Sequence, residues 1–145
     1  MTRVALDTSC MVAAVCSWHD RHADALAEIE RRLDAGHRLT IPAHALLETY
    51  AVLTRLPAPH RLAPADAWAL VKGNFVDRAT VTTLDARAHV ALLARLADAR
   101  IGGGRTYDAA IAAAAQDGGA DVLLTFNVRH FDPLPAALHI VEPTG

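Results

Sequence analysis

The feature that most constrains the fold is a repeated alternation of short apolar runs with longer segments of helical spacing. The apolar runs resemble strands and occupy residues 3–7, 37–42, 79–84, 121–126 and 138–143. Helical spacing of apolar residues covers residues 22–36, 43–55, 64–77, 85–100 and 106–119. Strands that alternate with helices are typical of a parallel sheet with helices on both faces. We therefore expect an α/β fold, with the last run at an edge of the sheet.

The length and composition of the chain fit one domain over residues 1–145 with a core of small aliphatic side chains. Hydrophobic residues make up 52% of the 145 residues, and aromatic residues only 5%. A chain of this length can bury a sizeable core. The helical segments are expected to carry apolar stripes on single faces, which include Leu47 with Tyr50, and Ala86, Val90, Leu93 and Ala97. The larger aromatic residues Trp18, Trp68, Phe75 and Phe131 are interpreted as core or dimer contacts.

Several function classes are disfavoured by the composition. The net charge of −2 does not mark a nucleic-acid binder, although a local basic patch is compatible with it. No run of about 18 or more consecutive apolar residues is present, so we expect no membrane span. Cys10 and Cys16 are six positions apart in one predicted helix and do not share a face. We expect them to stay reduced, in a cytoplasmic protein.

Four side chains with oxygen ligands fall at related positions in this pattern. Asp7 ends the first strand, Glu48 lies in the helix after the second, Asp108 begins an alanine-rich helix, and Asn127 follows the strand 121–126. Each has a structural alternative: a helix cap for Asp7, a surface position for Glu48, a dipole contact for Asp108 and a turn for Asn127. Sites of parallel α/β folds form beyond the carboxyl ends of the strands, and the shared placement favours one site.

The chemistry of these residues suggests a hard divalent cation. Carboxylate and amide oxygens suit Mg²⁺ or Mn²⁺, which keep several waters and contact phosphates. Such a site fits hydrolysis of a phosphodiester bond. Ser9 and Thr125 are expected to orient a carboxylate or a water, or alternatively to bond the backbone.

Four segments carry a resemblance to a known family: "ALDTS" at 5–9, "LLETY" at 46–50, which is expected to be buried, "YDAAIAAAA" at 107–115 and "LLTFNVRHF" at 123–131. In order and spacing they resemble the blocks of a PIN domain. More narrowly, the chain is similar to VapC-type toxins, the ribonuclease half of bacterial toxin–antitoxin pairs. The resemblance covers nearly the whole chain.

The resemblance implies a three-layer α/β/α fold and endonucleolytic RNA cleavage that depends on Mg²⁺ or Mn²⁺. It also implies a homodimer and inhibition by a small cognate antitoxin. Asp7, Glu48 and Asp108 match the acidic metal ligands of the family. Asn127 stands where many members carry a fourth acid, and an amide there leaves the occupancy of a second metal site open.

Other readings remain at this stage. A phosphatase with Asp7 as nucleophile would need a second Asp at the position of Ser9. A PIN-like module that binds RNA or protein without cutting it is also compatible with Asn127. Arg105 and Arg129 flank the site and are candidates for RNA phosphates or for structural roles.

Further polar and flexible segments are given structural interpretations. The triple glycine at 102–104 is interpreted as a hinge beside the site, because it does not match a phosphate-binding loop. His19 and His22 lack the further ligands of a zinc site and are expected at the surface. His130 is interpreted as a turn residue.

Overall fold

The core of the structure is a sheet of five parallel strands in the order β3-β2-β1-β4-β5. The chain is described by a computed structural model, which covers residues 1–131 and 137–144. The strands are β1 (Arg3–Leu6), β2 (Arg38–Pro42), β3 (Thr80–Thr82), β4 (Val122–Leu124) and β5 (His139–Val141). The predicted parallel sheet is confirmed, and β5 lies at an edge as expected.

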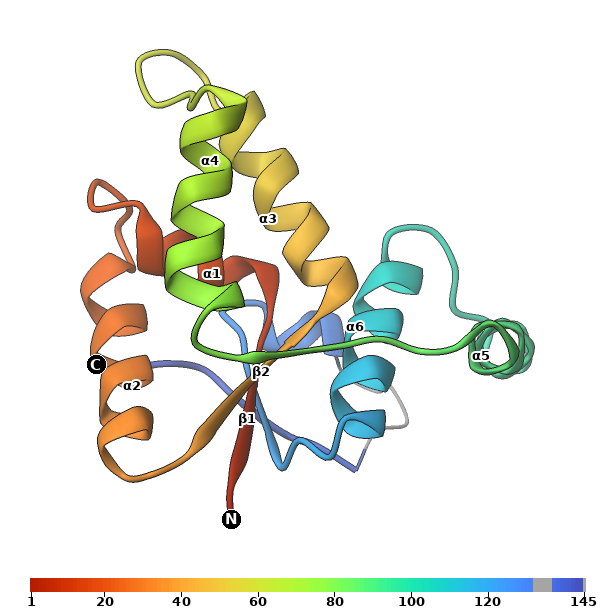
Figure 1. Cartoon of the computed structure of the whole chain (residues 1–145). Coiled ribbons are helices and arrows are strands. Elements are labelled where there is room, and N and C mark those ends of the chain that lie inside the picture. The colour runs from red at the N-terminus through yellow and green to blue at the C-terminus, as the bar shows by residue number, and fades with distance from the viewer. Residues whose placement is uncertain (132–136, 145) are drawn as a thin grey trace.

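Helices follow the strands and form the outer layers of a three-layer α/β/α fold (Figure 1). They are α1 (Thr8–Val15), α2 (His22–Asp34), α3 (Ala43–Arg55), α4 (Pro64–Val71), α5 (Ala86–Asp98) and α6 (Arg105–Asp117). Helix α4 continues into a π-helical turn, Lys72–Val76, and a short 3-10 helix, η2, covers Val128–Phe131. Figure 1 shows α2 and α6 on opposite sides of the sheet, while α5 stands apart from the body of the molecule.

The sequence explains why these elements form where they do. Strands β1 and β4 are apolar and buried because they lie in the middle of the sheet, covered on both faces. Gly36 ends the turn after α2 with φ +83°, a conformation that disfavours other residues. The alanine residues of α6 at 109, 112 and 115 are buried, which lets this helix lie close to the sheet.

Two of the predicted apolar stripes do not face the core. Leu47 on α3 is 69% exposed, while Val90 and Leu93 on α5 are 68% and 58% exposed. The buried positions of α5 are instead Leu92 and Leu96. Periodicity fixes the spacing of a stripe but not its phase, and a helix that packs on one neighbour covers only a narrow face. The expectation of a buried "LLETY" segment is therefore wrong at Leu47.

The aromatic residues interpreted as core or dimer contacts lie in two different environments. Phe75 and Phe131 lie in the core, whereas Trp18 and Trp68 are about half exposed. Cys10 and Cys16 form no disulfide, as predicted, and both are buried. Within the described residues, no helix combines the length and the apolar composition needed to cross a membrane.

Candidate active site

The buried acid Asp7 lies where β1 ends and α1 begins. Its side chain is nearly inaccessible, because the whole residue is only 4% exposed. Oδ2 accepts hydrogen bonds from Thr125 Oγ1 at 2.7 Å and from Ser9 Oγ at 3.0 Å. The Asp7 side chain makes no capping bond to α1, so the helix-cap interpretation does not explain it. Since both hydroxyls bond the same oxygen, Oδ1 is not engaged by either of them.

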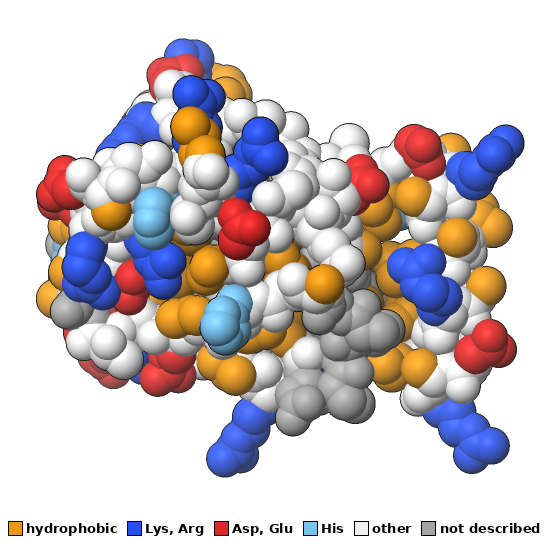
Figure 2. Space-filling view, turned by 90° about the horizontal axis from the view of Figure 1, so that it is seen from below, with side chains coloured by type: hydrophobic (Ala, Val, Ile, Leu, Met, Phe, Trp, Pro, Cys, Tyr) orange, Lys and Arg blue, Asp and Glu red, His pale blue; other side chains and the backbone are white. Residues whose placement is uncertain are grey.

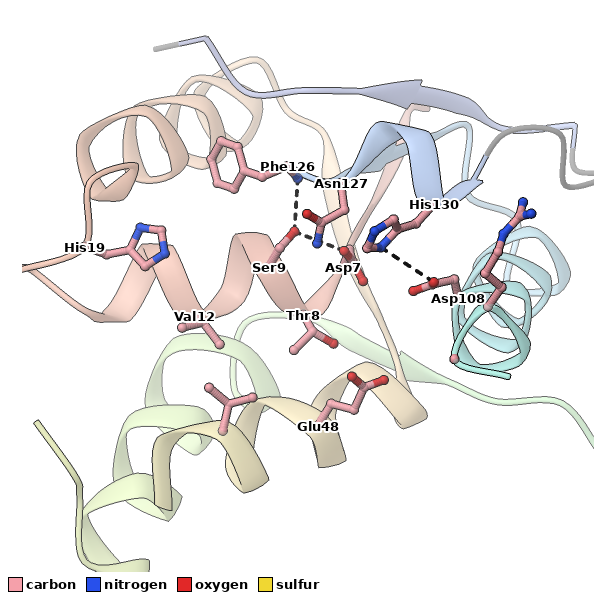
Figure 3. A pocket seen from close by; sticks show the side chains of 13 residues that line it. Asp7, Thr8, Ser9, Val12, His19, Glu48, Asp108, Phe126, Asn127 and His130 are labelled. Carbon is pink, nitrogen blue, oxygen red and sulfur yellow. Dashed lines mark hydrogen bonds and ion pairs between the residues drawn. The ribbon is translucent and has the colours of Figure 1, made fainter. Parts of the chain in front are cut away.

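The two hydroxyls that hold Asp7 are themselves fixed by the backbone after β4. The amide of Phe126 donates to Ser9 Oγ at 3.0 Å (Figure 3). The amide of Asn127 donates to Thr125 Oγ1 at 2.9 Å. Each hydroxyl accepts from the backbone and donates to the carboxylate. Ser9 and Thr125 thus make both kinds of contact considered from the sequence, one to a carboxylate and one to the backbone, and the network joins α1 to the end of β4.

The other two carboxylates come from helices that lie across a cavity from Asp7. Glu48 projects from α3 with its side chain 41% exposed, and its Oε1 lies 2.8 Å from His44 Nε2. Asp108 lies in the first turn of α6, and its Oδ2 lies 3.7 Å from His130 Nδ1. Asp7, Glu48 and Asp108 line one cavity of about 760 Å³, together with Asn127. Figure 3 shows the three carboxylates around the same space.

The charges of these acids act on one another. Burial raises the pKa of Asp108, and the negative charges of Asp7 and Glu48 raise it further. His130 and Arg105 act in the opposite direction on the same pKa. Because like charges disfavour ionisation, the cavity holds a repulsive arrangement that a bound cation would relieve.

The donor set fits a hydrated divalent cation better than a closed metal cage. Among residues 1–131 and 137–144, no three His, Cys, Asp or Glu side chains are grouped closely enough to hold a metal directly. The carboxylates of Asp7, Glu48 and Asp108 therefore converge less closely than the sequence analysis suggested. Mg²⁺ needs only one or two direct carboxylates, because it keeps several waters and takes substrate phosphates as ligands. An open cavity lined by carboxylates and an amide meets those requirements.

Comparison with known proteins identifies the family. A model described as "PIN domain" matches residues 4–134. The chain belongs to the PIN domain family. It is 40% identical over 126 residues to Ribonuclease VapC40 of Mycobacterium tuberculosis (strain ATCC 25618 / H37Rv), and the match covers 87% of each protein. Ribonuclease VapC27 of the same strain is 39% identical over 119 residues, which is 82% of this chain and 81% of VapC27.

A solved structure agrees with the fold of this PIN domain. DNA-bound VapBC from Salmonella typhimurium aligns with a TM-score of 0.71 at 24% identity, and the alignment covers 98% of both chains. This alignment confirms the three-layer fold, and the family match with the two relatives confirms the resemblance stated from the four sequence segments.

Two histidines near the PIN domain cavity were not predicted as site residues from the sequence. His19 lines the cavity from the loop after α1, and its Nδ1 accepts the amide of Arg21 at 3.0 Å. His130 was interpreted as a turn residue, yet one turn of η2 brings it over Asp108. That turn begins next to Asn127, whose carbonyl accepts the His130 amide at 2.9 Å. The position of His130, three residues after Asn127, could have indicated that it lies near the site. No feature of the sequence pattern indicated that His19 does.

The remaining candidates are placed as follows. Arg105 lines the cavity beside Gly104, the last residue of the triple glycine. Arg129 is exposed on η2 and is not among the residues that line the cavity. His22 contacts the carbonyl of Ala13 at 2.8 Å, which gives it a structural role.

Proposed function

We propose that this PIN domain is a divalent-metal-dependent endoribonuclease that acts as the toxin of a toxin–antitoxin pair. The observation that carries the proposal is that Asp7 after β1, Glu48 on α3 and Asp108 on α6 line one cavity. Burial raises the pKa of Asp108 there, and the charges of Asp7 and Glu48 raise it further. The names of the relatives VapC40 and VapC27, both ribonucleases, support RNA as the substrate.

The proposed cofactor is Mg²⁺, with Mn²⁺ as an alternative. Asp7, Glu48 and Asp108 would hold the ion, and Asn127 would assist through its amide oxygen. When bound, the ion supplies an acidified water and positive charge against the scissile phosphate. The family resemblance implies in-line attack on phosphorus, which leaves a 5′-phosphate and a 3′-hydroxyl.

The protein's own groups have distinct parts in this proposal. Thr125 and Ser9 hold the Asp7 carboxylate in one orientation, because both donate to its Oδ2. The positive charge of Arg105 reduces the net negative charge of the cavity, and His130 and Arg105 both lower the pKa of Asp108. Without such groups an acidic cavity would repel the RNA backbone. Contacts from Arg105 to RNA phosphate are part of the proposal, and Arg129 lies farther from the cavity.

The experiment that tests this function is RNA cleavage during metal titration. We expect cleavage with Mg²⁺ or Mn²⁺, none with EDTA, and loss of cleavage in Asp108→Asn. Asp117→Asn is the matched control, because Asp117 is an exposed acid at the other end of the same helix. Full activity in EDTA would refute the metal requirement. A folded, metal-loaded protein that binds RNA without cutting it would favour the non-enzymatic module.

The same titration tests the phosphatase alternative. That reaction would release phosphate from small esters through a covalent bond to Asp7. The structure offers little support for it, since the position expected for a second Asp is Ser9, which donates to Asp7 Oδ2.

The proposed protein partners are a small antitoxin and a second copy of this chain. VapBC as a structural neighbour supports an antitoxin. The exposed Val90 and Leu93 on α5 support a homodimer, since large side chains of this kind are often covered by a partner. Figure 2 shows hydrophobic side chains along the lobe on the right, which is the α5 side of the molecule. As a toxin, the chain is expected to arrest growth when expressed alone and to be relieved by the antitoxin.

A further inference from the structure

Glu48 is supported differently from the other two carboxylates of the cavity. Asp7 is buried and held by two hydroxyls, and Asp108 is fixed close to the backbone of α6 by its short side chain. Glu48 has a longer side chain that is 41% exposed, so many orientations are open to it. Its close polar contact is His44, one turn earlier on α3, with Nε2 at 2.8 Å from Oε1.

The ring of His44 is itself held in place by an aromatic contact across two helices. It stacks on Tyr107, with ring centroids 4.9 Å apart and planes only 2° from parallel. Tyr107 immediately precedes Asp108 on α6, and α3 packs against α6. The stacked pair therefore links the helix that carries Glu48 to the helix that carries Asp108.

We propose that His44 is a positioning residue for Glu48 and that Tyr107 fixes the ring of His44. The contact of Nε2 with Oε1 restrains the carboxylate of Glu48, a residue that lines the same cavity as Asp7 and Asp108. A neutral ring with its proton on Nε2 is sufficient for this contact. Residues that contact a metal ligand fix its orientation, so removing such a residue commonly lowers the affinity for the metal. This proposal rests on the metal-dependent function proposed above.

A purely structural reading makes a different prediction. Side-chain pairs four residues apart on an exposed helix face contribute little to the free energy of unfolding. That contribution does not depend on whether a ligand is bound. If His44 and Glu48 were only such a pair, removing His44 would change helix stability slightly and leave metal affinity unchanged. The affinity for a metal thus separates the two roles.

The experiment is calorimetric titration of the full chain with Mn²⁺ alone, without RNA. We expect His44→Ala to weaken Mn²⁺ binding about tenfold, in the range seen for other outer partners of metal ligands. His44→Gln should bind nearly as wild type does, because its amide N–H replaces the Nε2 donor. Tyr107→Ala should weaken binding less than His44→Ala, and Tyr107→Phe should retain the stack and the affinity. The free energy of unfolding without metal, measured for each variant, shows that the variants are folded.

The control is His89→Ala. His89 contacts the carbonyl of Asp85 four residues earlier on α5, so it is a histidine of similar local setting outside the acidic cavity. Wild-type affinity in His44→Ala, or equal losses in His44→Ala and His44→Gln, would overturn the positioning role. If Asp108→Asn still weakened binding in that case, the proposed metal site would stand. Absence of Mn²⁺ binding in the wild type would overturn both proposals.

Discussion

Three buried threonines offer a direct measure of what the Thr125 hydroxyl does for Asp7. Thr125 and Thr49 are fully buried, and Thr40 is nearly so. The Thr125 hydroxyl donates to a carboxylate, and the Thr49 hydroxyl donates to the carbonyl of Ala45 at 2.8 Å. Among the residues that the structure describes, the Thr40 hydroxyl has no hydrogen-bond partner. Replacement by Val keeps the branched shape in each case and exchanges only the hydroxyl for a methyl group.

The contacts set the expected order of the three variants. Thr125→Val loses a hydrogen bond to a charged group, which is worth about 1.5–3 kcal/mol. It also leaves the amide of Asn127 without its acceptor, so we expect a total loss of about 2–4 kcal/mol in the free energy of unfolding. Thr49→Val removes a bond to a carbonyl within its own helix and should cost about 0–1 kcal/mol. Thr40→Val removes a buried, unpartnered hydroxyl and should stabilise the protein by about 1 kcal/mol.

Urea denaturation at neutral pH, followed by circular dichroism, measures all three variants under one protocol. Equal dependence of the free energy on urea concentration would show that the unfolded states are comparable. The reasoning would be refuted if Thr125→Val cost no more than Thr49→Val, since the hydroxyl would then give Asp7 no net support. It would also fail if Thr40→Val destabilised the protein as much as Thr125→Val.

Three further predictions concern charge and assembly. Because the pKa of Asp108 is raised in the folded protein, its ionisation costs stability as pH rises through that pKa. Asp108→Asn should therefore gain stability over wild type at neutral pH and lose the advantage in acid, and urea titrations that show a pH-independent difference would contradict this. Asn127→Asp raises the formal charge of the ligand set from −3 to −4, so calorimetry should show tighter binding of a second divalent ion to the free protein; unchanged binding would show that Asn127 does not set metal occupancy. Leu93→Glu should shift a dimer toward monomer in light scattering, whereas Leu26→Glu on α2 should not, and a dimeric Leu93→Glu protein would exclude this face of α5.

The fold was predictable because buried parallel strands have a recognisable local sequence pattern, a short continuous apolar run. The segments 121–126 and 3–7 are apolar without polar alternation, and each is bounded by residues that end strands. Their partners in the sheet follow from alternation with helices, since parallel strands need a crossover between them. Which face of an exposed helix packs against the protein was not predictable in the same way. On α5 the stripe with Val90 and Leu93 is as regular as the buried stripe with Leu92 and Leu96, and only the position of α6 decides between them.

The candidate site was predictable to the extent that its residues stand at ends of elements. Asp7 and Asn127 follow strands, and Asp108 opens a helix, so topology brings them to one edge of the sheet. The contacts that hold these residues were harder to predict, because they join segments far apart in the chain. The bond from Thr125 to Asp7 spans 118 positions, and the stack of His44 on Tyr107 depends on how α3 crosses α6.

The three carboxylates differ in a graded way that bears on how the cavity would close. Asp7 is buried and doubly held, Asp108 is partly buried beside His130, and Glu48 is the most exposed and depends on one contact to His44. Moving Asp7 would break two charge-assisted hydrogen bonds, whereas moving Glu48 requires only side-chain rotation. A cation drawn into the cavity should therefore meet Asp7 where it already lies, while the side chain of Glu48 rotates toward it. Under the proposed function, this order would let carboxylates that do not form a closed metal cage in the described residues act as one site when a cation and a phosphate arrive together.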